Sequence, residues 1–366
     1  MKSAKQKKSM RTSLFILLTV LSLFVSLVGC SSFSFVQEPD ENGGAPTDTP
    51  SPDIQQAISP TQPQPTTYYN RYTGLACDEA FLSCRPISVC IGNFDENRQS
   101  GLSFADILIE APIDGEKTRL WAISTAPSLT TTLSGVASVR DYMMPSLKAF
   151  GAIGAYAGTT DTVGATASVY NGDNLDYIYH NLTDTFKKDE TGTLTTTGIA
   201  LQGAAAGRGY SLTDTECTLP YRFAELGKRY TPSGNTVRSI SFRYSMANTI
   251  KFTYNEETGA YTREQKGAEH IDSATGNALT FANILLLFHN VNYYHTATET
   301  SFSLDTESGG DGYLYTGGGV VTVRWRYTND GALSILTDDG EVITVNRGKT
   351  YIGMLRVTDS TSLIAK

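Results

Sequence analysis

The chain has 366 residues, with 29 Lys and Arg against 37 Asp and Glu, and a formal net charge of −8. This acidic balance argues against binding to nucleic acid or anionic lipid through bulk charge. Hydrophobic residues make up 40% of the chain and charged residues 18%, so the chain can bury a core, and its length predicts two domains after an N-terminal leader and linker.

Residues 1–29 have the pattern of a lipoprotein signal peptide. Five basic residues precede the uncharged apolar stretch 14–28, and small Gly29 follows. The tetrapeptide Leu27-Val28-Gly29-Cys30 resembles a bacterial lipobox, which implies cleavage after Gly29 and a diacylglycerol on Cys30. An uncleaved signal anchor is the alternative, because the apolar stretch is near the shortest membrane span. Cleavage would remove the five basic residues and change the formal net charge from −8 to about −13.

Residues 30–67 predict a disordered tether rich in Pro and Thr. The segment 31–67 contains seven prolines and no Lys or Arg. Such a composition buries too little apolar surface to offset the entropy of ordering. Fully extended at ~3.1 Å per residue, the tether would span about 110 Å. We therefore expect a protein anchored to the cell membrane on its extracytoplasmic face, with a folded part that reaches the depth of wall polymer.

Residues 68–230 predict a mixed α/β domain. Apolar alternation predicts strands at 86–91, 107–111, 118–124 and 152–157. Helices are predicted at 102–107, at 138–150 after the N-cap Ser138, and from Asp214 toward Leu226. Pro145 could kink the second helix, and Pro220 weakens the third.

Residues 236–358 predict a β-rich antiparallel domain after a joint at 231–235. Ile240, Phe242 and Tyr244 alternate with polar residues, and further apolar strands follow at 284–288, 320–327 and 351–357. The predicted fold class is therefore α+β, with a mixed α/β domain followed by a β-rich sandwich or partly open barrel.

Four cysteines remain after Cys30, and they allow three disulfide pairings: Cys77, Cys84, Cys90 and Cys217. Location outside the cytoplasm would permit disulfides, but packing is the simpler role for Cys84 and Cys90, which flank a predicted strand. The sequence has no C-x-x-C motif, which gives little support to a redox or zinc site.

The richest polar cluster lies between residues 93 and 119. Arg98 and Arg119 could hold a carboxylate or phosphate, with Asn93 and Ser100 completing the hydrogen bonds. Alternatively, Asp106 and Glu110 could neutralise these arginines in a half-buried network. The ligand-binding candidates are Asn93, Arg98, Gln99, Ser100, Asp106, Glu110, Arg119 and Arg140.

An enzyme is the runner-up hypothesis. Asp106 and Glu110 could serve as the general acid and base of an enzyme that acts on cell-wall glycan. They would face each other on a helix, but a strand beginning near Ile107 would separate them. No G-x-S-x-G elbow or H-E-x-x-H pair is present, so we expect no metal and no cofactor. The 20 Tyr and 2 Trp could stack on sugars, although most alternate within strands as packing residues.

The sequence resembles the YerB-like family of bacterial lipoproteins over most of residues 70–357. The first group of matching residues is Arg85-Pro86-Ile87-Ser88-Val89, Asn93, Arg98-Gln99-Ser100-Gly101-Leu102-Ser103, Ala105-Asp106-Ile107, Glu110 and Thr118-Arg119. The second group is Tyr254-Asn255-Glu256-Glu257-Thr258-Gly259-Ala260-Tyr261-Thr262-Arg263, Gly267, His270, Asp272, Thr275-Gly276 and Asn283. The resemblance implies a two-domain exported lipoprotein of unestablished biochemical function.

Three positions depart from the family pattern. Ala137 stands where a second Arg is typical, Tyr156 lies near a usual His, and residues 207–210 replace a Pro-His-Asn segment. Any chemistry performed by those His residues in relatives would be lost here. We therefore expect a non-enzymatic binding or scaffold module that contacts an envelope protein or wall polymer. A transporter-associated solute receptor would need two similar α/β lobes, which the β-rich second half disfavours.

Overall fold

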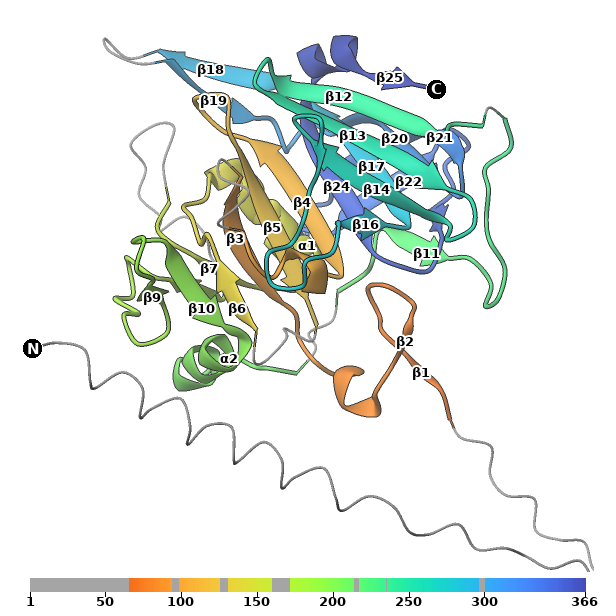
Figure 1. Cartoon of the computed structure of the whole chain (residues 1–366). Helices are drawn as coiled ribbons and strands as arrows, with labels where there is room; N and C mark the ends of the chain where they lie inside the picture. The colour runs from red at the N-terminus through yellow and green to blue at the C-terminus, as the bar shows by residue number, and fades with distance from the viewer. Residues whose placement is uncertain are drawn as a thin grey trace, which may run out of the picture. The chain divides into compact units, whose positions relative to one another are not determined.

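The computed structural model describes residues 66–93, 99–125, 131–159, 172–213, 217–234, 236–295 and 300–366 (Figure 1). These residues belong to one compact unit, Gln64–Lys366. The predicted signal peptide, Cys30, the tether up to residue 65, and Arg98 lie outside the described residues.

A ten-stranded sheet forms the centre of the unit. From the first half of the chain come β3 (Ile87–Asn93), β4 (Ile107–Pro112), β5 (Thr118–Ser124), β7 (Ile153–Tyr156) and β8 (Asn174–Asp176). From the second half come β17 (Asn283–His289), β20 (Gly310–Thr316), β21 (Gly319–Tyr327), β22 (Leu333–Thr337) and β24 (Thr350–Arg356). The strand order is β22-β21-β20-β17-β24-β4-β5-β3-β7-β8. The halves meet where β24 pairs in parallel with β4, from Thr350 opposite Ile107 to Gly353 opposite Glu110.

The central strands are buried on both faces. Every residue of β3, β4 and β5 is buried, which is why these strands are rich in Ile, Val and Leu. Successive side chains enter two different apolar clusters: Leu108 packs in one, whereas Ile107 and Ile109 pack in the other. A polar side chain on these strands therefore needs an internal partner.

A second sheet packs against one face of the first. Its strands are β12 (Ser239–Ser245), β13 (Asn248–Asn255), β14 (Ala260–Gln265), β15 (Ala268–Glu269), β16 (Thr280–Phe281) and β25 (Ile364–Ala365). Alternate residues of β13 and β14 are buried, so each strand has one inward face. Phe252 of this sheet contacts Tyr351 of β24, with ring centroids 4.9 Å apart. Aromatic packing of this kind joins the two sheets.

Short elements surround these sheets. The small strands are β1 (Tyr68–Tyr69), β2 (Ala76–Cys77), β6 (Thr132–Ser134), β9 (Lys187–Lys188), β10 (Leu194–Thr197), β11 (Tyr221–Phe223), β18 (Val291–His295), β19 (Thr300–Leu304) and β23 (Ile343–Val345). The helices are η1 (Glu79–Phe81), η3 (Leu102–Phe104), η4 (Asp141–Met143), α1 (Met144–Ala149), α2 (Gly198–Gly207) and η6 (Val357–Ser362). Among the described residues, no helix combines the length and the apolar character that a membrane crossing requires.

The predicted α+β fold class is wrong, because strands dominate both halves of the chain. The helix predicted at 102–107 is only the single turn η3, since β4 begins at Ile107. The helix predicted at 138–150 is reduced to η4 and the six-residue α1, whose start carries Pro145. In place of the helix predicted toward Leu226, β11 pairs in parallel with β23, a partner more than 100 residues away. The strands predicted in the first half are confirmed: β3, β4, β5 and β7. The division into domains at 231–235 stays a prediction.

Candidate functional site

Glu110 lies at the centre of a buried polar cluster. Its carboxylate forms an ion pair with Arg263 of β14, with 2.7 Å between Arg263 Nη2 and Glu110 Oε2, and both side chains are 0% exposed. The Tyr351 hydroxyl donates to the same oxygen at 2.7 Å. Asn93 Nδ2 donates to the other oxygen, Oε1, at 2.8 Å, and Thr118 Oγ1 donates to it at 2.6 Å. Each carboxylate oxygen thus accepts two hydrogen bonds.

The cluster continues through a ring of amide and imidazole groups. Arg263 Nη1 donates to His270 Nδ1, and His270 Nε2 lies 2.5 Å from Gln99 Oε1. This pattern assigns the hydrogen of a neutral imidazole to Nε2. Burial lowers the pKa of His270 well below its ordinary value, and the Arg263 charge lowers it further. Gln265 closes the ring: its Nε2 donates to Asn93 Oδ1 at 3.0 Å.

We name this cluster the Glu110 network: Asn93, Gln99, Glu110, Thr118, Arg263, Gln265, His270 and Tyr351. Burial would lower the pKa of Arg263, but the Glu110 charge, the hydrogen bond to Glu110 and the neighbouring Tyr351 and Tyr244 together raise it. The network connects β3, β4 and β5 with β14 and β24, so it holds the two sheets together. Apart from Arg263 Nε, which is buried without a hydrogen-bond partner, the network is extensively bonded, which fits a structural element that fixes the packing of the sheets.

The sequence prediction missed five members of the network: Thr118, Arg263, Gln265, His270 and Tyr351. A signal for two of them was present, because Tyr261, Arg263 and Gln265 occupy alternate positions on the inward face of β14. Two polar residues on the buried face of a strand indicate an internal partner.

Asp106 lies apart from Glu110. It precedes β4 and accepts hydrogen bonds from Thr125 N at 2.8 Å and Thr125 Oγ1 at 2.7 Å. Burial raises the pKa of Asp106, and the hydrogen bonds from Thr125 oppose that rise. Four residues of extended chain separate the backbones of Asp106 and Glu110 by about 13 Å at the usual rise, and their carboxylates bond to different partners, Thr125 and Arg263. The two acids are therefore held in separate hydrogen-bond networks and do not flank one site as the paired carboxyls of a glycosidase do.

Arg119 and Arg140 lie across the sheet from the Glu110 network. Arg119 is next to Thr118 on β5, so its side chain points to the opposite face. There its Nε donates to the Ser138 carbonyl at 2.8 Å, and burial lowers the pKa of Arg119. Arg140 pairs with Asp114, with 3.2 Å between Arg140 Nη2 and Asp114 Oδ2.

The predicted site residues thus fall in several places. Asn93, Gln99 and Glu110 join one network, whereas Asp106, Arg119 and Arg140 do not. Ser100 Oγ donates to the Thr132 carbonyl at 2.6 Å. A ligand-binding role for these residues stays a prediction.

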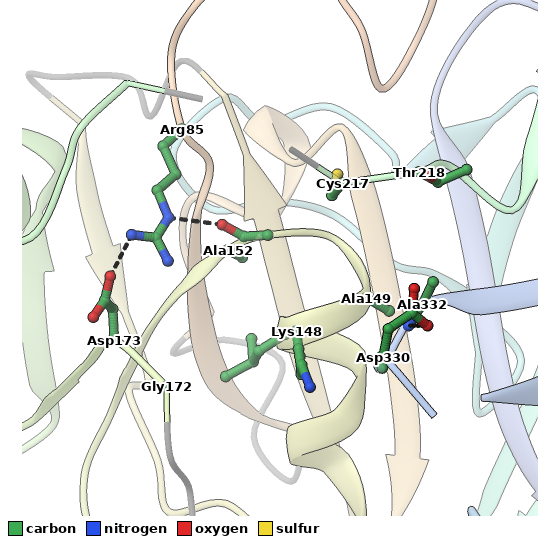
Figure 2. Close-up of a pocket in the computed structure, with 13 residues that line it drawn as sticks. Arg85, Lys148, Ala149, Ala152, Gly172, Asp173, Cys217, Thr218, Asp330 and Ala332 are labelled. Carbon is green, nitrogen blue, oxygen red and sulfur yellow. Dashed lines mark hydrogen bonds and ion pairs between the residues drawn. The ribbon is translucent and has the colours of Figure 1, made fainter. Parts of the chain in front are cut away.

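A surface cavity of about 350 Å³ lies at the start of β3 and β7 (Figure 2). Arg85 binds Asp173 on one side of it and donates to the Gly151 carbonyl at 2.8 Å. Asp330 lies on the other side, with Lys148 between. The charges of Arg85 and Asp173 neutralise each other, so this side of the cavity has no net charge to attract an ionic ligand.

The described part of the chain contains no group of three or more His, Cys, Asp or Glu side chains able to hold a metal ion. Cys77, Cys84, Cys90 and Cys217 are free thiols. Burial raises the pKa of Cys90 to about 12, so this thiol is unreactive at neutral pH.

Two family models match the chain. The N-terminal domain of a protein of unknown function (DUF3048) matches residues 72–211, and the C-terminal domain of the same family matches residues 240–352. The Bacillus subtilis (strain 168) protein named "Putative lipoprotein YerB" is 27% identical over 297 residues, which cover 80% of this chain and 87% of that protein. The chain belongs to the YerB-like family.

A solved structure agrees with this assignment. The crystal structure of the YerB protein from Bacillus subtilis matches with a TM-score of 0.69 at 25% identity, and the match covers 82% of this chain and 99% of that one. The Glu110 network joins residues from both YerB-like family models, with Asn93 and Glu110 in the first and Arg263 and His270 in the second. In this member of the family, the two matched regions therefore share one buried ion pair.

Proposed function

We propose that this chain is a lipid-anchored protein on the extracytoplasmic face of the cell membrane, and that its folded unit is a non-enzymatic binding module for an envelope protein or wall polymer. The lipobox-like Leu27-Val28-Gly29-Cys30 and the seven-proline segment after it support the anchor and the tether. A relative named as a lipoprotein supports the same placement.

The observation that carries the binding role is the state of Glu110. A catalytic carboxylate needs access to its substrate, yet this side chain is 0% exposed and accepts hydrogen bonds from four protein donors. Asp106, the second acid of the enzyme alternative, lies four residues earlier, about 13 Å along the extended backbone, and its carboxylate bonds to Thr125. These features favour a structural role for both acids over the glycan-acting enzyme.

A wall-binding and crosslinking experiment tests the proposal. The full-length protein in detergent is incubated with purified wall material, and membranes from cells that express it are crosslinked before solubilisation. The control protein keeps residues 1–67 and carries an unrelated folded domain in place of residues 68–366. We expect wall sedimentation, or one reproducible crosslinked envelope protein, for the native chain alone. Equal recovery with both proteins would contradict the binding role.

The same material tests the enzyme alternative. The enzyme hypothesis would replace the binding hypothesis if the unmodified chain turned over the wall material and if Asp106→Asn or Glu110→Gln variants that remain folded did not. We expect no turnover, because the two carboxyls are separated and Glu110 is shielded.

A further inference from the structure

A second surface cavity, of about 330 Å³, lies beyond the end of β4. We name it the Tyr293 cavity. Its walls come from the turn after Pro112, from the end of β12 at Ser245, from the β18–β19 hairpin, and from Arg356 at the end of β24. Its volume is at the small end of the range for ligand pockets, roughly 300–1,000 Å³.

One wall is aromatic. Tyr293 on β18 is paired with Phe302 on β19, so the two rings lie side by side on the hairpin. Phe302 is buried and stacks on Tyr142, with ring centroids 6.1 Å apart and planes at 24°. Tyr293 lines the cavity and is 56% exposed, so much of this aromatic side chain is accessible there. A large exposed ring on a fixed support offers an apolar platform with a polar tip.

The other walls are polar and held in place. Arg356 Nε lies 3.0 Å from Asp359 Oδ2, its Nη2 donates to the Tyr244 carbonyl, and its guanidinium lies 5.7 Å from the centre of the Phe302 ring. This side chain is still 24% exposed. Asp114 is held by Arg140 at 3.2 Å, with 36% of its side chain exposed. Groups fixed in this way need little further ordering when a ligand binds.

The charges around the cavity compensate each other. Of the described residues that line it, the charged ones are Asp114, Glu116, Lys117 and Arg356, two of each sign. Such a lining gives no net attraction to a phosphate or to a cation. It combines donors and acceptors with an aromatic face, which is the chemistry that recognises a neutral molecule rich in hydroxyl and amide groups.

The cavity lies at the opposite end of the folded unit from β1, the first strand of the described chain. The chain enters at β1, and Asn70 beside it bonds to Asp106 at the start of β4. β4 then runs six residues, about 20 Å, to Pro112 at the cavity. The picture agrees, with β1–β2 at the bottom and β18–β19 at the top (Figure 1). The Arg85–Asp173 cavity is on the side of β1, because Cys217 in its lining contacts Tyr72.

We propose that the Tyr293 cavity binds a neutral carbohydrate, a short segment of an N-acetylated or hydroxylated sugar chain, with one ring packed on Tyr293. This inference rests on the proposed function, since it names the ligand class of the binding module.

Calorimetric titration of the full-length protein in detergent with the tetramer of N-acetylglucosamine tests the site. We expect saturable binding that Tyr293→Ala weakens at least tenfold and that Tyr293→Phe largely retains, because the ring face is preserved. Tyr179→Ala is the matched control: Tyr179 is 70% exposed and is not among the residues that line this cavity. Thermal unfolding of each variant checks the fold, and a change at an exposed position should be small.

The inference is overturned if the native chain shows no saturable binding of the tetramer, or if Tyr293→Ala binds it as tightly as the control. If the native chain still sediments with wall material or crosslinks to an envelope protein but does not bind the tetramer, the carbohydrate site is refuted and the proposed function is not. If the native chain shows no tetramer binding, no wall sedimentation and no crosslinking, the proposed function is refuted as well.

Discussion

Replacing Glu110 by Gln tests whether the polar cluster is structural. The change leaves the Arg263 charge without its anion at a position where both side chains are 0% exposed. The new amide also places an NH₂ group against donors on one side, either Asn93 and Thr118 or Arg263 and Tyr351. Removing one partner of a buried ion pair costs about 3–5 kcal/mol. We expect a loss of that size in the free energy of unfolding, measured by guanidinium denaturation followed by circular dichroism.

A matched control and a double variant sharpen this test. Glu269→Gln changes an exposed acid on β15, in the sheet that carries Arg263, and should alter the free energy of unfolding by less than ~0.5 kcal/mol. Glu110→Leu combined with Arg263→Met removes both charges and should lose less stability than the sum of the two single changes. A loss below ~1 kcal/mol for Glu110→Gln, with an unchanged denaturant slope, would refute the buried pair.

Two further results are expected from the structure. Burial lowers the pKa of His289 from 6.5 to about 4, so between these pH values the unfolded chain binds a proton that the folded chain does not. The free energy of unfolding should therefore fall by about 3 kcal/mol from pH 7 to pH 4, and His289→Phe should largely remove this fall. A free energy of unfolding that does not change with pH would refute this. Gly317→Ala should lose ~1–3 kcal/mol more stability than Gly340→Ala, measured by thermal unfolding. Both glycines have positive φ, but only at Gly317 would the new Cβ lie 2.1 Å from the Tyr230 carbonyl oxygen. Equal losses in the two variants would contradict the close contact.

The sequence predicted the strands better than the helices. β5 has the predicted bounds, and β3, β4 and β7 lie within two residues of theirs, because their apolar patterns reflect local burial. β11 could not be predicted, since its extended form depends on pairing with β23 far along the chain. α2 was missed among Gly and Thr residues, although Thr197 caps it by accepting a hydrogen bond from Ala200 N and four alanines favour it.

The site was predicted only in part. Asn93, Gln99 and Glu110 were recognised as a polar group, but their partners Arg263 and His270 lie more than 150 residues later. The pairing of Glu110 with Arg263, and not with Arg119, follows from how the second sheet packs on the first. No local pattern encodes that packing. Asp106 and Glu110 were predicted to face each other only on a helix, and the strand separates them.

The central claim is that Cys30 carries a lipid that anchors the folded unit outside the cell. Metabolic labelling with an alkyne analogue of palmitate, followed by membrane fractionation, tests it directly in cells that express the native chain or a Cys30→Ala variant. The account predicts label in the membrane-bound native chain and none in the variant. Label that persists in Cys30→Ala, or an unlabelled native chain recovered from the cytosol with its leader intact, would contradict it.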